Sequence, residues 1–171
     1  MEDPETSHEL ATHWRLEADR HEKRGENLAA AKSYEQAAEA LSYEDDEALG
    51  YLNQAAINYR LAGNGRLGAR YWAKAHELFD RVIANTGDPA LRARAQRDKA
   101  MLYLAQQDYD RALDLLGFSR RELVKSQNWV EFYCTLGFEG RVFYEQASAI
   151  WRGVAYYPPI RCYAVSTTCM S

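Results

Sequence analysis

The residues nearest to a metal-binding motif are His8, Glu9 and His13, close to the start of the chain. A zinc-binding helix carries two histidines four residues apart, so that both face the same ion. Here the histidines are five residues apart, and at about 100° per residue their side chains diverge. No third ligand follows, so we expect neither a metal nor another cofactor.

Three glycines, Gly63, Gly65 and Gly68, have the spacing of a dinucleotide-binding loop. Such a loop holds a pyrophosphate at a helix N-terminus only when a buried strand comes directly before it. An amphipathic helix is expected before these glycines, so their spacing favours a structural turn.

No serine, cysteine or lysine lies in a recognisable setting beside a base, and the carboxylates are scattered singly along polar helix faces. Cys134 lies near Phe132, Tyr133 and Leu136. This setting favours a small core residue over a reactive thiol. These patterns predict that the protein is not an enzyme.

The chain has 171 residues, of which 47% are hydrophobic and 27% charged, which is enough for one domain with a buried core. A net charge of −4 argues against nucleic-acid binding. No apolar run reaches the roughly 18 to 20 residues that cross a bilayer, so we expect no membrane insertion. The start of the chain has no signal-peptide pattern, and three cysteines form no disulfide framework. Both features favour a cytoplasmic protein.

The elements that must position any site are helices, because proline is rare and apolar residues recur at helical spacing. Gly25 is expected to end the first helix, and Gly87 to cap the fourth in the left-handed conformation. Asp88 is expected to cap the N-terminus of the fifth. The expected helices cover about residues 8–24, 28–41, 49–63, 66–84, 90–106, 109–126 and 129–151. Seven helices and no strand make an all-α protein.

A spaced set of seven residues recurs three times along the chain. The second copy lies 38 residues after the first, and the third lies 44 residues after the second. Small residues at fixed positions let paired helices approach closely, while aromatic residues fill the space between pairs. The copies are Trp14, Ala18, His21, Gly25, Ala30, Tyr34 and Ala37, then Leu52, Ala56, Tyr59, Gly63, Gly68, Trp72 and Ala75, then Gln96, Ala100, Tyr103, Gln107, Ala112, Leu116 and Ser119.

This pattern, together with the stretch from Leu104 to Leu113, resembles tetratricopeptide repeats. The resemblance implies a right-handed α-solenoid of antiparallel helix pairs over residues 1–153, followed by a tail at 154–171. The implied repeats cover about 11–44, 49–85 and 93–126, with a partial repeat at 129–152. The repeats are longer than the usual ~34 residues, Gln96 replaces a large residue, and the closing prolines are missing. Long repeats with paired alanines are also similar to the soluble NSF attachment proteins.

In the tetratricopeptide resemblance, the first helix of each pair builds a concave face that binds a partner peptide or helix. Arginine on such a face presents forked donors suited to carboxylates and peptide backbone. Arg15 and Arg94 match basic positions of the family's carboxylate clamp. Its other positions hold Asp19, Gln54 and Asp98 in place of asparagine or a basic residue, so only part of the clamp is present. The residues carried over to the concave face are Arg15, Asn53, Ile57, Arg60, Arg94, Arg97, Met101 and Leu104.

Aromatic residues lie on several sides of the last helix, more than one packed face needs. We expect an apolar surface there for a homodimer or for a missing neighbour. The helical period is lost before Pro158 and Pro159, and the tail from 154 to 171 is a cap, a partner-binding segment or disordered. The candidate interface residues are Trp129, Phe132, Phe138, Phe143 and Trp151.

The sequence therefore predicts a non-enzymatic scaffold or adaptor that binds another protein or peptide through the concave face or the aromatic last helix. The alternative is an enzyme or a small-molecule sensor with a site between helices. Its lining would be Tyr59, Trp72, Tyr103 and Arg97. A membrane-trafficking adaptor is a third interpretation, which follows from the similarity to the attachment proteins alone.

Overall fold

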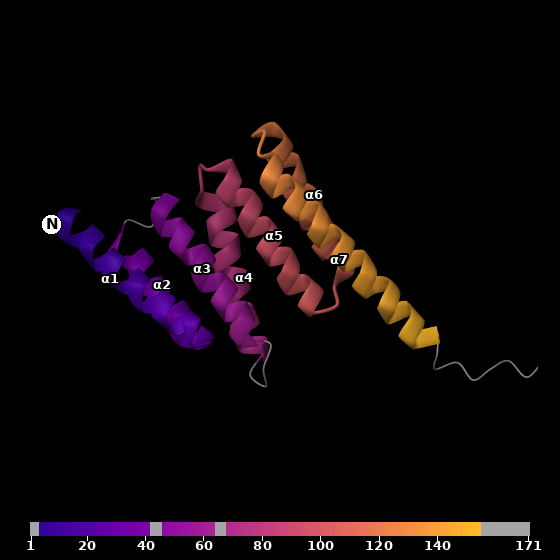
Figure 1. The fold of residues 1–171 in the computed structure, drawn as a ribbon, viewed down its shortest axis with the longest axis horizontal. Helices are drawn as coiled ribbons and strands as arrows, with labels where there is room; N and C mark the ends of the chain where they lie inside the picture. Colours follow the sequence, from indigo (N-terminus) through magenta and orange to yellow (C-terminus); the bar gives the residue numbers. More distant parts are fainter. Residues whose placement is uncertain (1–3, 42–45, 64–67, 155–171) are drawn as a thin grey trace, which may run out of the picture.

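The computed structural model describes residues 4–41, 46–63 and 68–154, and within these ranges the chain forms helices and no strand. The helices follow one another in a row, each packed against the next (Figure 1). The prediction of an all-α protein with seven helices is confirmed for the described ranges. Residues 155–171, nearly all of the predicted tail, lie outside them. The helices are α1 (Pro4–Lys23), α2 (Asn27–Ala40), α3 (Asp46–Gly63), α4 (Gly68–Asn85), α5 (Pro89–Ala105), α6 (Tyr109–Lys125) and α7 (Trp129–Val154).

Three turns between helices share one hydrogen-bond pattern. After α1, Gly25 has a φ of 72°, and the Glu26 N–H donates to the His21 carbonyl at 2.9 Å. Gln107 after α5 and Gln127 after α6 take the same left-handed conformation, with φ of 62° and 55°. This closure satisfies the last carbonyls of each helix and turns the chain back within a few residues. The predicted end of the first helix at Gly25 is confirmed.

The turn between α4 and α5 is built differently. Gly87 has no positive φ, so its predicted role as a left-handed cap is wrong. Instead, the Thr86 hydroxyl donates to Asp46 at 2.7 Å, which ties this turn to the start of α3. Asp88 accepts a hydrogen bond from the N–H of Ala90 at 2.8 Å, which confirms the predicted N-cap.

Alanines allow neighbouring helices to approach closely, and larger apolar residues fill the remaining space in two clusters. The first cluster runs from α1 to α5 and includes Leu52 and Phe79. The second joins α5, α6 and α7 and includes Leu116 and Val142. Because α5 contributes to both clusters, it connects the two halves of the row. The alanines of the repeated set that are completely buried are Ala18, Ala30, Ala37, Ala56, Ala75, Ala100 and Ala112.

Tyrosine hydroxyls tie the first helices together. Tyr34 on α2 donates to Asp19 on α1 at 3.0 Å, and Tyr59 on α3 donates to Glu35 on α2 at 2.5 Å. Glu35 also forms an ion pair with Lys74 on α4 at 3.1 Å. Burial, followed by the hydrogen bonds to carboxylates, raises the pKa of both tyrosines well above the usual value. Both hydroxyls therefore remain donors at neutral pH.

Cys134 is exposed on α7, so its expected place in the core is wrong. Its neighbour Tyr133 is also exposed. The apolar residues of α7 lie on more than its packed face, and local composition alone therefore misplaces this thiol.

Replacing Ala75 with leucine tests the close approach of α4 to its neighbours. Ala75 is completely buried, so the larger side chain overpacks the core and should lower the free energy of unfolding by about 1–3 kcal/mol. Ala73→Leu, on the exposed face of the same helix, is the matched control and should change it by less than about 0.5 kcal/mol. Urea denaturation measures both, and equal stabilities would contradict the close packing.

Candidate functional site

The helices α3, α5 and α7 bring polar side chains together, although each is separated from the next by another helix in the sequence. α3 contacts α5, and α5 contacts α7. Asn53 on α3 hydrogen-bonds Asp98 on α5. Arg97 on α5 forms an ion pair with Glu131 on α7. We refer to this shared polar side of the three helices as the α3–α5–α7 wall.

Arg97 is the side chain that joins α5 to α7 within the wall. It donates to Glu131, its Nε lies 3.7 Å from Asp98 Oδ1, and its guanidinium carbon lies 5.4 Å from the centre of the Phe138 ring. Only 14% of the Arg97 side chain is exposed. Burial raises the pKa of Asp98, and the nearby Arg97 guanidinium opposes that rise. Arg97 is therefore held by the fold.

A pocket of about 250 Å³ lies where the three helices of the wall meet. Met101 and Leu104 are largely buried and give the pocket an apolar base. Two arginines, one from α3 and one from α7, are among its polar lining residues. The lining residues are Arg60 from α3, Met101, Leu104 and Ala105 from α5, Gln107 from the following turn, and Arg141 and Glu145 from α7.

The two arginines of the pocket differ from Arg97 because neither is neutralised by a close carboxylate. Among the residues that the structure describes, neither Arg60 nor Arg141 has a carboxylate oxygen within 4.0 Å. The Nε atom of Arg60 is buried and has no hydrogen-bond partner there. Burial lowers the pKa of Arg60, Asp98 opposes that effect, and Arg141 adds to it. An anion in the pocket would relieve the repulsion between the two cations.

Three of the residues predicted for the concave face, Arg60, Met101 and Leu104, come together in this pocket. The prediction missed Arg141 and Glu145, which lie on the incomplete fourth repeat. Arg60 and Leu104 each follow the aromatic position of their repeat directly. Continuing the repeat spacing into α7 would have indicated the region of Arg141.

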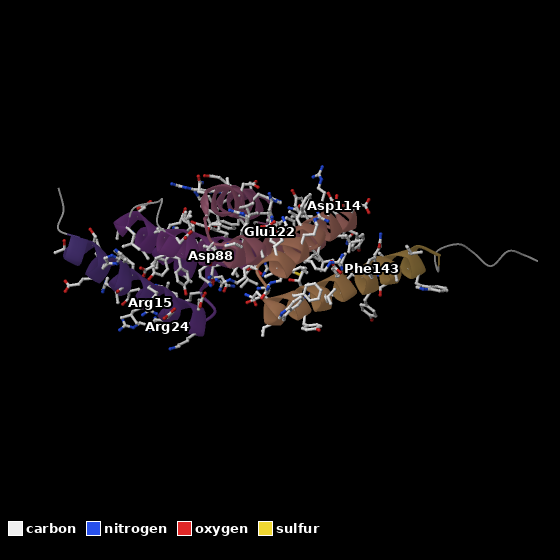
Figure 2. The ribbon with its side chains drawn as sticks, turned by 90° about the horizontal axis from the view of Figure 1, so that it is seen from above. Arg15, Arg24, Asp88, Asp114, Glu122 and Phe143 are labelled. Carbon is white, nitrogen blue, oxygen red and sulfur yellow. The ribbon has the colours of Figure 1, made fainter. Side chains whose placement is uncertain are left out.

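The other predicted residues of the concave face lie elsewhere. Arg15 pairs with Asp19 on its own helix at 3.2 Å, at the end of the row opposite to α7 (Figure 2). Arg94 is exposed on α5. Asn53 is buried, and Ile57 packs against the first apolar cluster. The partial clamp suggested by the sequence is therefore not assembled around Arg15.

The five candidate interface residues of α7 differ in exposure. Trp129, Phe143 and Trp151 are all more than half exposed. Phe132 is half-buried, whereas Phe138 packs against the second apolar cluster. The exposed members are thus available to a partner, and Phe138 belongs to the interior.

The four residues of the small-molecule alternative lie in different surroundings. Tyr59 lines a pocket between α2 and α4, and Trp72 packs against the first apolar cluster. The ring of Tyr103 lies 4.8 Å from that of His76, and Arg97 contributes to the wall. Among the described residues, no pocket is lined by all four of these side chains.

Comparison with family models, curated proteins and solved structures finds no match for this chain. The fold and the pocket themselves define an all-helical protein with consecutively packed helices and a two-arginine pocket between α3, α5 and α7. Within the described ranges, no helix combines the length and apolarity needed to cross a membrane. The same ranges contain no cluster of three histidine, cysteine or acidic residues placed to hold a metal ion.

Arg97→Met tests the structural role of the wall's central cation. The substitution leaves Glu131 and Asp98 without their guanidinium partner, so the free energy of unfolding should fall by about 3 kcal/mol. Arg94→Met, an exposed position on the same helix, should change it by less than about 0.5 kcal/mol. Chemical denaturation at neutral pH distinguishes the two, and a negligible loss for Arg97→Met would remove its assigned role.

Proposed function

We propose that this chain is a non-enzymatic scaffold that binds another protein, and that the pocket of the α3–α5–α7 wall receives an acidic side chain of the partner. The observation that carries the proposal is the pair Arg60 and Arg141. Their side chains come from two helices, line one pocket and lack a close carboxylate among the described residues. Guanidinium groups bind carboxylates through paired hydrogen bonds, which favours an acidic ligand.

The pocket suits a glutamate or aspartate side chain in its shape and its charge. Met101 and Leu104 offer apolar contact to the methylene groups of such a side chain. Glu145 also lines the pocket. The two arginines and this one carboxylate give the pocket lining a net charge of about +1. That charge matches one carboxylate better than a doubly charged phosphate.

The arrangement of the helices supports binding of an extended or helical segment. The wall runs across three helices, so a bound segment of the partner can also contact residues of the wall outside the pocket. The resemblance to tetratricopeptide repeats points in the same direction, because such repeats bind peptides along the first helices of their pairs. That support is by analogy, and the pocket chemistry is independent of it.

Fluorescein-labelled hexaglutamate is a suitable probe for the proposed acidic ligand. We expect saturable binding, measured by fluorescence anisotropy at about 0.15 M ionic strength, where surface attraction is screened. Arg60→Gln plus Arg141→Gln should weaken this binding at least tenfold, because both forked donors are lost. Unlabelled butyrate, which carries a single carboxylate, should compete more strongly than inorganic phosphate.

Arg111→Gln plus Arg121→Gln is the matched control. It removes the same charge from exposed positions on α6 and should leave the affinity within about twofold. The proposal is wrong if the probe does not bind, or if the two double variants weaken its binding equally. Stronger competition by phosphate would replace the acidic peptide with a phosphate-bearing ligand.

A further inference from the structure

α7 carries a second surface on the side opposite to its packed face. Thr135 and Val142 are completely buried against the rest of the protein. α7 has 26 residues whereas α6 has 17, so its last turns extend past the helix on which it packs (Figure 1). The large apolar side chains of α7 outside its packed face have exposed fractions between 51% and 76%, and they are Trp129, Val130, Tyr133, Phe143, Tyr144, Ile150 and Trp151.

The centre of this surface has the spacing of a helix–helix seam. Its positions follow one another in steps of four and three residues, the spacing of a coiled coil, and none is charged. A Cβ atom added at Gly137 or Gly140 would meet no atom within 4 Å, so both positions are open gaps beside bulky neighbours. We call this set the α7 seam, and its members are Trp129, Tyr133, Gly137, Gly140, Tyr144, Ala147 and Trp151.

The α7 seam complements itself when it is reversed about Gly140. A two-fold interface requires that the same surface meets itself with reciprocal contacts. In an antiparallel pair of α7 helices crossing at Gly140, residues equally far from the glycine on its two sides face each other, and the two backbones approach at the glycine. Two of these pairs set a bulky side chain against a small one. The opposed positions are Trp129 with Trp151, Tyr133 with Ala147, Gly137 with Phe143, Leu136 with Tyr144, and Gly140 with its own copy.

We infer that the occupant of this surface is a second copy of the chain, bound through its own α7 seam. Six of the seven exposed apolar side chains of α7, all but Val130, offer about 800 Å² per copy if each carries roughly 150–250 Å² of surface. A stable protein interface buries about 800 Å² on each partner. The area and the self-complementary spacing thus both suit a dimer.

This inference goes beyond the proposed function and is independent of it. Arg141 and Glu145 line the pocket shared with α3 and α5, whereas the α7 seam lies on the opposite side of the helix from Val142. Arg141 directly follows Gly140 and Glu145 directly follows Tyr144, so each lies about 100° around α7 from its seam neighbour, at the edge of the seam. Loss of peptide binding and loss of the dimer are separable results.

Sedimentation equilibrium of the full chain tests the dimer. We expect a dimer that dissociates on dilution, and Tyr144→Glu should raise its dissociation constant at least tenfold because the charge would be buried without a partner. Phe118→Glu, at an exposed apolar position on α6, is the matched control and should leave the constant within about twofold. A monomer at every concentration, or equal effects of both variants, overturns the inference.

Disulfide trapping tests the register. Cys134, Cys162 and Cys169 are first replaced by serine, and single cysteines are then introduced by Gly140→Cys or Gly137→Cys. Gly140 meets its own copy at the crossing point, so this variant should form a covalent dimer under mild oxidation. Position 137 faces residues six positions further along the partner helix, about 9 Å away from its own copy, which exceeds the usual Cα separation of a disulfide. Equal trapping of both variants would contradict the antiparallel register.

Discussion

The close approach of helices at buried alanines is the constraint on which the rest of this structure depends. Where Ala18, Ala56 and Ala75 lie against neighbouring helices, no larger side chain holds the backbones apart. Each helix can then contact both the next helix and, along α3, α5 and α7, the next but one. The pocket exists because this second kind of contact brings α3 and α7 to the two sides of α5.

The arginines of the wall and its pocket form two groups, one paired with carboxylates and the other without a carboxylate within ion-pair distance in the described part of the chain. Arg97 lies between Glu131 and Asp98, and its cation compensates carboxylates that burial would otherwise make costly. Arg60 and Arg141 have no such compensation within ion-pair distance among the described residues. The first arrangement holds helices together, and the second is suited to an external anion. The α7 helix adds an exposed apolar surface on its other side, so the proposed dimer and the proposed acidic ligand involve different groups of residues.

The sequence predicted most where local chemistry decides the structure. Asp88 caps α5 and Gly25 closes α1 because a carboxylate beside free N–H groups and a residue without a Cβ act on their immediate neighbours. Gly87 was misjudged because Thr86 fixes that turn through a residue forty positions away. Cys134 was misjudged because apolar composition does not tell which side of a helix is packed.

The pocket was predictable only in part for a related reason. Arg60 and Leu104 follow from the repeated spacing, which carries information about helix faces. The contribution of Arg141 depends on how α7 crosses α5, and no short-range signal in the sequence specifies that crossing. The pairing of Arg97 with Glu131, thirty-four residues away, is likewise a tertiary contact. Arg97 was predicted to bind a partner, but in the structure it joins α5 to α7.

Arg60 and Arg141 line one pocket. The central proposal is that they bind an acidic group from a partner protein. Nuclear magnetic resonance of arginine Nε–Hε groups tests it most directly, because the buried Nε of Arg60 is shielded from exchange with water. On addition of hexaglutamate, the account predicts that the Arg60 and Arg141 signals shift together and saturate, while that of exposed Arg121 stays in place. Unchanged Arg60 and Arg141 signals, with shifts confined to exposed arginines, would contradict it.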